Sequence, residues 1–322
     1  MKRIGLFCGG FSSEFDISLK SAKTISAHFP KNLDCVLIIV KKDGWEVQTE
    51  NGTVLFDLNS ASYTANGRSE RIDAALIYTH GDPGENGKIQ AYLDMMGIPY
   101  LNSGVLASAL SFDKWYCNQF LKGFGFKVAK SEILTEQTQE SNQALIEELG
   151  LPIFVKPADS GSSYGISKVK TAAELTPALE LAFKEGKRVV LESFLDGIEV
   201  TCGVYRSSKG LVALPLTEIV SETEFFDYEA KYSGKSQEIT PARIEDTLRD
   251  KVQDTAKRIY DLLGLKAIAR IDFMLVGQEP YVIEVNTTPG FSPASIVPQM
   301  LAAADISITD FWQEIIQVEL KS

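Results

Sequence analysis

The most informative pattern of hydrophobic and polar positions lies at residues 267–291. Two apolar, β-prone stretches, residues 267–275 and 281–285, flank a short segment that contains a glycine and a proline. Such a pattern predicts two strands joined by a turn. We expect Leu275 to lie opposite Tyr281 across a five-residue loop.

This hairpin gathers polar side chains on one face. Because side chains alternate between the faces of a strand, Arg270 shares a face with Asp272, and Glu284 shares one with Asn286. The expected register places Asp272 opposite Glu284 and Arg270 opposite Asn286. Two facing carboxylates repel each other unless a cation lies between them, and oxygen ligands of this kind suit Mg²⁺. The alternative is the solvated face of an edge hairpin.

A serine and a proline follow the hairpin, after the sequence Asn-Thr-Thr-Pro-Gly-Phe at residues 286–291. Ser292 as an N-cap with Pro293 at the first helical position predicts the start of a helix, and the free N–H groups of a helix start attract anions. A cation site, an arginine and an anion-binding helix end within one short segment favour phosphate chemistry.

The N-terminal third predicts a parallel α/β arrangement. Apolar runs at residues 4–7, 35–40 and 74–78 indicate buried strands, and a glycine-rich turn and a helix ending near residue 29 follow the first of them. The turn, Gly9-Gly10, does not match the GxGxxG fingerprint, so a dinucleotide-binding domain is disfavoured.

Polar residues follow the first and third of these strands. Ser12, Ser13 and Glu14 lie where the turn enters the helix, and Glu14 is a candidate partner for a substrate amine; simple helix capping is the alternative. His80 lies in a glycine-rich loop, residues 80–87, at the strand ends where α/β proteins bind ligands. For a single histidine the alternative is a structural role.

The middle of the chain begins with an expected helix that contains Asp113 and Lys114. Farther on, a predicted strand at residues 153–157 leads into a glycine- and serine-rich loop, residues 158–165. The backbone N–H groups of such a loop can close over phosphates, and Lys156 just before it can reach one. No Walker A sequence follows, and an ordinary flexible hairpin is the alternative.

The last third contains a long polar segment, residues 222–239, whose aromatic side chains indicate a lid; a disordered excursion is the alternative. An amphipathic helix is expected near the C-terminal end, with Phe311 and Trp312 in the core. Further strands and helices are predicted at residues 166–169, 189–191, 199–204, 244–263 and 308–320.

Composition limits the class of protein. The chain has 322 residues, of which 44% are hydrophobic and 23% charged, as in globular proteins with two or three domains. A net charge of -11 argues against nucleic acid or an anionic membrane as a partner. Four single cysteines, with no CxxC pair, favour a cytoplasmic location without a zinc site or a disulfide framework. The lack of an apolar run of about 18 residues predicts that no segment spans a membrane.

Seven segments in chain order resemble D-alanine–D-alanine ligases of the ATP-grasp superfamily. They are GGFSSEFDIS, HGDPGENGKIQ, GIPYLNSGVLASALSFDK, FVKPADSGSSYGISKV, FFDYEAKY, ARIDF and IEVNTTPGFSPASIVP. The resemblance implies an α/β (α+β) fold, with an N-terminal pre-ATP-grasp, Rossmann-like domain at residues 1–104 and a two-lobed ATP-grasp fold after it. The central lobe is expected at residues 105–187 and the C-terminal lobe at residues 188–322, with the lid loop at residues 222–239.

The resemblance also implies a reaction. In this family ATP phosphorylates the carboxylate of one D-alanine, the amine of a second attacks the acyl phosphate, and D-alanyl-D-alanine is released for peptidoglycan precursor synthesis. Charge develops on phosphoryl oxygens and then on a tetrahedral oxygen, so metal ions, lysines and arginines are expected to carry the catalysis. The implied cofactors are ATP and two Mg²⁺ ions, with Mn²⁺ as a substitute, and a homodimer is the implied assembly.

One set of residues is assigned by the resemblance to metal ions and the tetrahedral oxygen, and another to ATP. Asp272, Glu284 and Asn286 are the implied magnesium ligands, and Arg270 with the backbone N–H of Gly290 is expected to stabilise the oxyanion. The implied ATP contacts are Lys114, Lys156, Ser162, Ser163, Glu192, Phe194, Leu195, Glu199 and Lys231.

The remaining assignments concern the two D-alanines. Glu14 is expected to pair with the ammonium of the first, near His80, whereas Ser295 and Ile296 are expected to hold the carboxylate of the second. The sequence departs from the family pattern at Phe15, Asn86 and Phe226, none of which is a proposed metal or oxyanion group; these departures concern substrate affinity and lid packing.

Tyr232 is expected to decide the second substrate. Its hydroxyl can join Glu14 and Ser162 in a hydrogen-bonded set that closes the lid. The resemblance implies Phe, which lacks this hydroxyl, at the same position in ligases that use D-lactate. The rival hypotheses are a D-alanine–D-lactate or other ATP-grasp ligase, and a non-catalytic ATP-binding regulator on the same fold.

Overall fold

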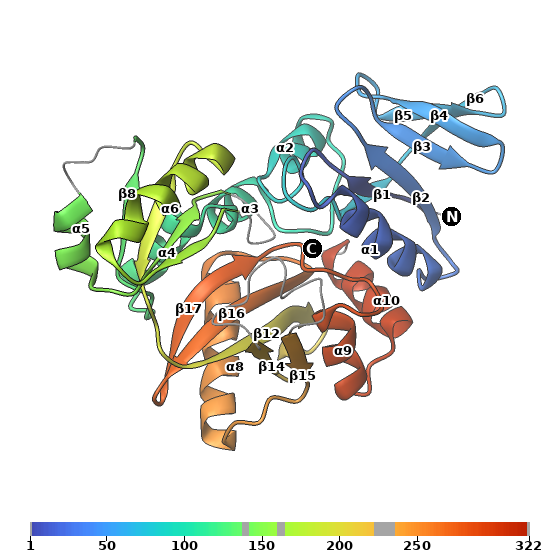
Figure 1. Cartoon of the computed structure of the whole chain (residues 1–322). Coiled ribbons are helices and arrows are strands. Elements are labelled where there is room, and N and C mark those ends of the chain that lie inside the picture. The colour runs from blue at the N-terminus through green and yellow to red at the C-terminus, as the bar shows by residue number, and fades with distance from the viewer. Residues whose placement is uncertain (1, 137–141, 160–164, 222–235, 321–322) are drawn as a thin grey trace.

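A computed structural model describes residues 2–136, 142–159, 165–221 and 236–320 (Figure 1). In this part of the chain the strands form three sheets, one in each third of the sequence. In Figure 1 the middle sheet, drawn in green and yellow, and the N-terminal sheet, drawn in blue, lie on opposite sides of the helices α2 and α3. The C-terminal sheet, with β16 and β17 in orange, lies below them.

The N-terminal sheet is parallel where the sequence predicts it to be. β1 (Arg3–Gly9) pairs in parallel with β2 (Asp34–Val40) and with β7 (Ala74–Ile77), and α1 (Phe15–Ala27) connects β1 to β2. The side chains of β1 alternate between two hydrophobic cores, one on each face of the sheet. This explains why its sequence is a continuous apolar run.

Four further strands extend this sheet as an antiparallel meander that our sequence analysis did not predict. They are β3 (Glu46–Thr49), β4 (Gly52–Asp57), β5 (Ser62–Ala65) and β6 (Arg68–Arg71), and the strand order is β6-β5-β4-β3-β2-β1-β7. These strands have only four to six residues and many exposed positions, so they lack a long apolar pattern. The helix α2 (Lys88–Met95) follows the loop after β7.

The middle of the chain forms an antiparallel sheet in the order β10-β9-β11-β8. Its strands confirm the predictions at residues 153–157, 166–169 and 189–191, and two helices pack in the same core. The elements are β8 (Ser131–Leu134), α5 (Asn142–Leu149), β9 (Ile153–Pro157), β10 (Ser167–Val169), α6 (Ala172–Glu185) and β11 (Val189–Ser193).

The C-terminal sheet has the order β15-β14-β12-β16-β17, with β13 paired to β12. It packs against α8, which confirms the predicted helix at residues 244–263 and buries an apolar stripe against the sheet. The elements are β12 (Ile198–Ser207), β13 (Gly210–Ala213), β14 (Thr217–Ser221), β15 (Ser236–Ile239), α8 (Asp246–Leu262), β16 (Ile268–Val276) and β17 (Glu279–Asn286).

The last helices bring the C-terminal end of the chain back to its start. α9 (Ile296–Ala303) and α10 (Ile308–Glu319) share one hydrophobic core with α1 and β1, and they lie beside α1 in Figure 1. Phe311 and Trp312 are 1% and 0% exposed in this core, which confirms their predicted role. Phe291, in the segment between β17 and α9, therefore packs in one core with β1 and α1 from the start of the chain and α10 from its end.

The helix predicted around Asp113 and Lys114 is two helices. α3 (Val105–Phe112) ends before Asp113, and α4 (Lys114–Gly123) begins after it. The extended Asp113 caps α4, because its side chain accepts a hydrogen bond from the Tyr116 N–H at 2.9 Å. Lys114 is thus the first residue of α4, at a bend of the chain.

None of the helices in the described ranges combines the length and the apolar sequence that a membrane span requires.

Candidate active site

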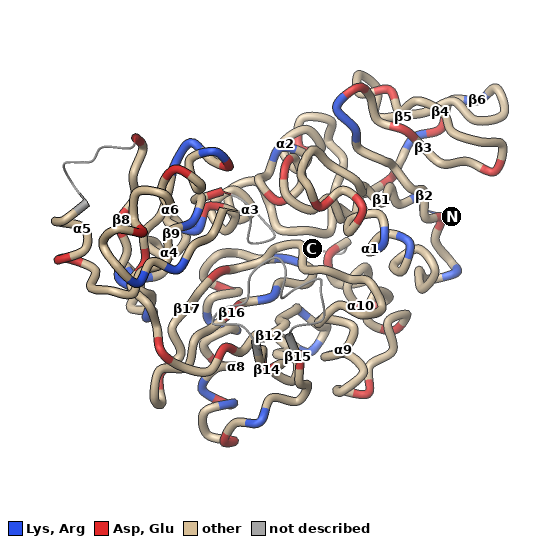
Figure 2. Tube along the Cα trace, viewed as in Figure 1, with Lys and Arg blue, Asp and Glu red and all other residues tan. Residues whose placement is uncertain are grey.

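The hairpin formed by β16 and β17 has the predicted register at its polar positions. Arg270 lies opposite Asn286, and Asp272 lies opposite Glu284. The two carboxylates and the amide therefore share one face of neighbouring strands. Acidic and basic positions lie side by side on this sheet (Figure 2).

The turn of the hairpin is shorter than predicted. Leu275 pairs with Pro280 rather than with Tyr281, because the chain reverses through two residues, the first of which is Gly277 at a φ of 61°. A bulge then leaves Ile283 as an extra residue on β17. The two deviations cancel, so the polar face is as predicted although the turn is not.

Arg270 holds Asp272 through two hydrogen bonds on β16. Its Nε and Nη2 atoms donate to Oδ1 and Oδ2 of Asp272, each at 2.8 Å. Only 18% and 11% of the two side chains are exposed. Burial lowers the pKa of Arg270, but the carboxylates of Asp272, Glu284 and Glu238 outweigh it and raise this pKa above its ordinary value. The guanidinium therefore stays charged in the site.

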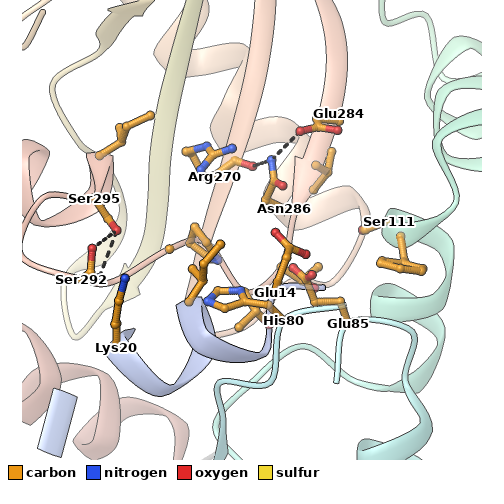
Figure 3. A pocket seen from close by; sticks show the side chains of 18 of the residues that line it. Glu14, Lys20, His80, Glu85, Ser111, Arg270, Glu284, Asn286, Ser292 and Ser295 are labelled. Carbon is orange, nitrogen blue, oxygen red and sulfur yellow. Dashed lines mark hydrogen bonds between the residues drawn. The ribbon is translucent and has the colours of Figure 1, made fainter. Parts of the chain in front are cut away.

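Asn286 and Lys114 connect the two facing carboxylates to the rest of the site. Asn286 Nδ2 donates to Asp272 Oδ2 at 3.1 Å and to Glu284 Oε1 at 3.5 Å, the second of which is drawn in Figure 3. Lys114 Nζ lies 3.7 Å from Glu284 Oε2. The two carboxylates thus share the Asn286 amide as a donor, and the positive charges of Arg270 and Lys114 offset the repulsion between them.

A cavity of about 420 Å³ lies next to this polar face, between the N-terminal part, α3 and the C-terminal sheet. In Figure 3, Glu14 and His80 point into it from the N-terminal part, opposite Arg270 and Asn286. Asp272 is buried beside Arg270 rather than exposed to the cavity. The predicted residues that line the cavity are Glu14, His80, Lys114, Arg270, Glu284, Asn286, Gly290, Ser295 and Ile296.

The helix start beside the cavity is three residues later than predicted. Ser292 and Pro293 form a turn, and Ser295 is the N-cap of α9. Ser295 Oγ accepts a hydrogen bond from the Ser292 N–H at 3.0 Å instead of capping α9. A Cβ atom added to Gly290 would lie 3.1 Å from this Oγ atom. Gly290 and the free N–H groups of α9 therefore lie close together at one end of the cavity.

A second group of predicted residues lies on the sheet β10-β9-β11-β8 in the middle of the chain, the central sheet. Lys156 Nζ on β9 is 2.6 Å from Glu192 Oε2 on β11, and less than a tenth of each side chain is exposed. The other oxygen, Glu192 Oε1, is buried and has no hydrogen-bond partner in the described ranges. Phe194 follows β11, and its ring contacts Lys168 Nζ at 3.9 Å from the centroid. Leu195 follows Phe194 in the same connection.

Glu199 lies near the start of β12, where it faces Ile219 of β14 and Met274 of β16 in the sheet. The described ATP contacts implied by the resemblance are therefore divided among three places, of which the C-terminal sheet with Glu199 is one. Lys114 lines the cavity, and Lys156, Glu192, Phe194 and Leu195 lie on or after the strands of the central sheet.

Comparison with known proteins gives the same result along the whole chain. The models for "D-ala D-ala ligase N-terminus" and "D-ala D-ala ligase C-terminus" match residues 3–103 and 120–317. The D-alanine–D-alanine ligase of Parabacteroides distasonis is 45% identical over 324 residues, which cover 100% of this chain and 98% of that protein. The chain belongs to the D-alanine–D-alanine ligase family.

Solved structures support the same family. D-alanyl-alanine synthetase A from Vibrio cholerae has a TM-score of 0.88 at 32% identity and covers 100% of this chain and 99% of its own. The D-alanine–D-alanine ligase from Bacillus anthracis complexed with ATP has a TM-score of 0.80 at 29% identity, with 100% and 98% covered. The predicted fold class, an N-terminal α/β domain followed by an ATP-grasp fold, is thereby confirmed.

The donor set of this ligase site fits Mg²⁺. Within the described ranges no three His, Cys, Asp or Glu side chains form a metal site, and the candidate set is two carboxylates and one amide. Mg²⁺ is usually held by one or two carboxylates together with phosphates and waters, so this set is sufficient. Asp272, Glu284 and Asn286 carry hard oxygen atoms of the kind that this ion prefers, and in the structure Arg270 bonds to both oxygens of Asp272.

Part of the predicted ligase site lies outside the described residues. This applies to Ser162 and Ser163 in the glycine- and serine-rich loop, to Lys231 and Tyr232 in the predicted lid, and to Phe226. The last four residues of the predicted lid are not a loop, because residues 236–239 form β15 and pair with β14.

Sequence reasoning missed several polar side chains of the cavity, among them Lys20, Glu85, Ser111 and Glu238. In Figure 3, Lys20 points from α1 toward Ser292 and Ser295. Glu85 belongs to the glycine-rich loop from which only His80 was selected. The buried Ser111 hydroxyl has no partner in the described part of the chain. Only the position of Glu85, in the predicted ligand-binding loop at residues 80–87, offered a hint in the sequence.

Glu85 has the most unusual protonation in the cavity. Its Oε2 atom accepts a hydrogen bond from the Gly81 N–H at 2.7 Å. Burial, and then the neighbouring charges of Glu14 and Glu284, raise the pKa of Glu85 to about 8, against the opposing effects of the Gly81 N–H and Lys114. Glu85 is therefore neutral at pH 7, beside a carboxylate that is assigned to bind an ammonium group.

We expect the free energy of unfolding to fall as the pH rises toward 8, and Glu85→Gln to remove part of this fall. The pKa of Glu85 is raised in the folded state, so its stability contribution is complete below the ordinary value of 4.5 and is lost as pH approaches about 8. The effect is on the order of a few kcal/mol, since each unit of pKa difference corresponds to about 1.4 kcal/mol. Urea unfolding between pH 5 and pH 8.5, without nucleotide or metal, measures it. Parallel curves for the two proteins would contradict the prediction.

Proposed function

We propose that the chain joins two D-alanines to D-alanyl-D-alanine with ATP, through an acyl phosphate, for peptidoglycan precursor synthesis. The observation that carries this proposal is the cavity in which Glu14, Arg270, Glu284, Asn286 and Ser295 converge from three separate segments, in a chain of this ligase family. An ammonium, a transferred phosphoryl group and a carboxylate each find a complementary partner there.

The first step forms an acyl phosphate. A carboxylate oxygen of the first D-alanine forms a bond to the γ-phosphorus of ATP as the bond to the leaving ADP oxygen breaks. The Glu14 carboxylate binds the ammonium group of this D-alanine and orients it near His80. Lys114 and Arg270 provide fixed positive charge toward the phosphoryl oxygens. Asp272, Glu284 and Asn286 would hold Mg²⁺, which would neutralise charge on the ATP phosphates.

The second step forms the peptide bond. The amine of the second D-alanine attacks the acyl carbon, and negative charge develops on a tetrahedral oxygen. Arg270 and the backbone N–H of Gly290 stabilise this oxyanion, and the C–O bond to phosphate then breaks. The N-terminal end of α9, with Ser295 and the N–H of Ile296, binds the carboxylate of the second D-alanine. Lys20 adds a positive charge on the same side of the cavity.

The nucleotide base is assigned to the central sheet. Glu192 Oε1 is a buried acceptor that has no partner in the described ranges, so it suits the amino group of adenine. Lys156 and the backbone of Phe194 and Leu195 complete this pocket, and Glu199 is assigned to the ribose. The loop with Ser162 and Ser163, and Lys231 of the lid, are assigned to the phosphates on the basis of the sequence alone.

Further parts of the proposal rest on the family and the composition. The domain boundaries at residues 104 and 187, the use of two Mg²⁺ ions with Mn²⁺ as a substitute, and a homodimer follow from the family. A cytoplasmic location follows from the family and from the single, unpaired cysteines.

The first experiment identifies the product by mass spectrometry. The protein is incubated with ATP, Mg²⁺ and D-alanine, and ADP release is followed, with D-lactate added in a parallel reaction. We expect D-alanyl-D-alanine as the main product in both, because a Tyr hydroxyl at position 232 completes the closing set. D-alanyl-D-lactate as the main product at neutral pH would overturn the role of Tyr232. No ADP from D-alanine would overturn the proposed function.

A further inference from the structure

One buried hydroxyl on α1 links His80 to the segment that follows β17. Ser21 Oγ accepts a hydrogen bond from the Phe291 N–H at 3.1 Å and lies 3.3 Å from His80 Nε2. Ser21 is 0% exposed, His80 4% and Phe291 0%. These contacts join positions that are far apart in the sequence, and the mechanism above uses none of them.

One direction in this link is fixed by chemistry. The Phe291 N–H can only donate, so Ser21 Oγ accepts there, and the hydroxyl keeps one proton and one lone pair for His80 Nε2. The His80 ring also has a hydrogen bond with the Thr288 backbone. The ring therefore has two partners within the protein.

Gly290 lies between the two anchored points. The Thr288 backbone on one side of it bonds to His80, and the Phe291 N–H on the other side bonds to Ser21. The Phe291 ring is also fixed, with ring centroids 5.1 Å from Trp312 and 5.9 Å from Tyr78. The backbone around Gly290 therefore has few ways to rotate, and the Ser21–His80 pair closes both ends of it.

We propose that Ser21 and His80 are a positioning pair that aims the Gly290 N–H at the tetrahedral oxygen. The inference rests on the proposed function, in which Gly290 is an oxyanion donor. Glu14 is the N-cap of the helix that carries Ser21. The helix α1 thus positions both the group that holds the first D-alanine and, through Ser21, the donor that stabilises the charge formed on it. A donor that is held before reaction costs no reorganisation during it.

The test is Ser21→Ala, compared with Ser18→Ala. Ser18 is also 0% exposed on α1, and its Oγ donates to the Tyr78 carbonyl at 2.6 Å and accepts from the Gly9 N–H at 2.8 Å. The Ser18→Ala variant therefore loses the same kinds of hydrogen bond as Ser21→Ala, but at a distance from Gly290. We expect Ser21→Ala to lower kcat about 10- to 100-fold, somewhat less than the loss of a whole oxyanion donor, with KM for ATP unchanged. Ser18→Ala should lower the melting temperature and leave kcat within about twofold.

A tetrahedral phosphinate analogue of the dipeptide provides a readout that a merely structural role would not move. Ser21→Ala should weaken binding of this analogue by a factor similar to its loss in kcat/KM, and binding of ATP by less than about twofold. Ser21→Thr, which keeps the hydroxyl, should recover most of kcat. Because the pair acts as a unit, Ser21→Ala should add little to the loss caused by His80→Ala.

Three outcomes would overturn the inference. They are wild-type kcat in Ser21→Ala, equal losses of kcat in Ser21→Ala and Ser18→Ala, and unchanged affinity for the phosphinate despite a lower kcat. The proposed function fails in a different way, which is the absence of D-alanyl-D-alanine from the wild-type reaction.

Discussion

Replacement of Arg270 by alanine is expected to abolish dipeptide synthesis while ATP still binds. The guanidinium lies in the cavity, is held by two bonds of 2.8 Å to Asp272, and keeps its charge because neighbouring carboxylates raise its pKa. Removal of one oxyanion donor typically costs about 100- to 1000-fold in kcat. Arg270 also faces the phosphoryl group, so we expect a loss at or above the upper end of this range.

The adenine pocket assigned to the central sheet does not involve Arg270, so nucleotide affinity is the internal control. Isothermal titration with ATP should give a Kd within about tenfold of the wild-type value, whereas coupled ADP release and mass analysis should show almost no dipeptide. The rate of dipeptide synthesis by Arg270→Lys should lie between the rates of the wild type and Arg270→Ala, because lysine keeps the charge but not the bidentate bond to Asp272. Normal dipeptide synthesis by Arg270→Ala would remove Arg270 from the mechanism.

Arg206 offers a matched control for the loss of an Arg–Asp pair. It is on β12 and pairs with Asp261 at 2.5 Å, but the two side chains are 44% and 60% exposed. Exposed pairs contribute about 0 to 1 kcal/mol to stability, so Arg206→Ala should retain wild-type activity and nearly wild-type stability. A similar loss of activity in both variants would indicate a general effect of removing positive charge.

The polar face of the hairpin was predictable because it depends on a period of two. Arg270, Asp272, Glu284 and Asn286 keep their faces once the two strands exist. The turn was not predictable to the residue, because a two-residue reversal with a bulge and a five-residue loop without one give the same pairing at these positions. Pattern alone decides which side chains share a face, and local backbone geometry decides how the chain turns.

The cavity itself could be predicted only in part. Residues adjacent to a strand end, such as His80 and Glu14, were found because ligands bind at those ends in α/β proteins. Lys20 and Ser111 lie inside helices, and nothing in their own surroundings in the sequence distinguishes them from ordinary surface or core positions. They reach the cavity because α1 and α3 pack next to the C-terminal sheet, which is a tertiary effect.

The Ser21–His80 link shows the same limit more clearly. His80 lies 59 positions and Phe291 lies 270 positions from Ser21 in the sequence. Ser18 is equally buried on the same helix, but its hydroxyl bonds to Gly9 at the end of β1 and to Tyr78 just after β7. Only the arrangement of α1 against the segment after β17 distinguishes the two serines.

Replacement of Glu284 by glutamine is the second change that we expect to remove nearly all activity. Glu284 lies opposite Asp272, and Asn286 bonds to both carboxylates. Glutamine keeps the size of the side chain but removes the negative charge of one of the proposed magnesium ligands. We expect kcat to fall by about 1000-fold and half-maximal activity to require at least about tenfold more Mg²⁺.

Thermal unfolding separates this loss of metal binding from misfolding. Without metal, Glu284→Gln relieves the repulsion between two facing carboxylates, so its melting temperature should equal or exceed that of the wild type. With Mg²⁺ and ATP together, the wild type should gain more in melting temperature than the variant, because ligands that bind only the folded state stabilise it more as their affinity increases.

Glu218→Gln is the matched control. Glu218 is a largely buried carboxylate on β14 of the same sheet, but it pairs with Arg243 at 2.7 Å, away from the cavity. This variant should lose stability and keep the wild-type Mg²⁺ requirement. An unchanged Mg²⁺ requirement in Glu284→Gln would show instead that the facing carboxylates are not the metal site, and that Arg270, Lys114 and Asn286 offset their repulsion.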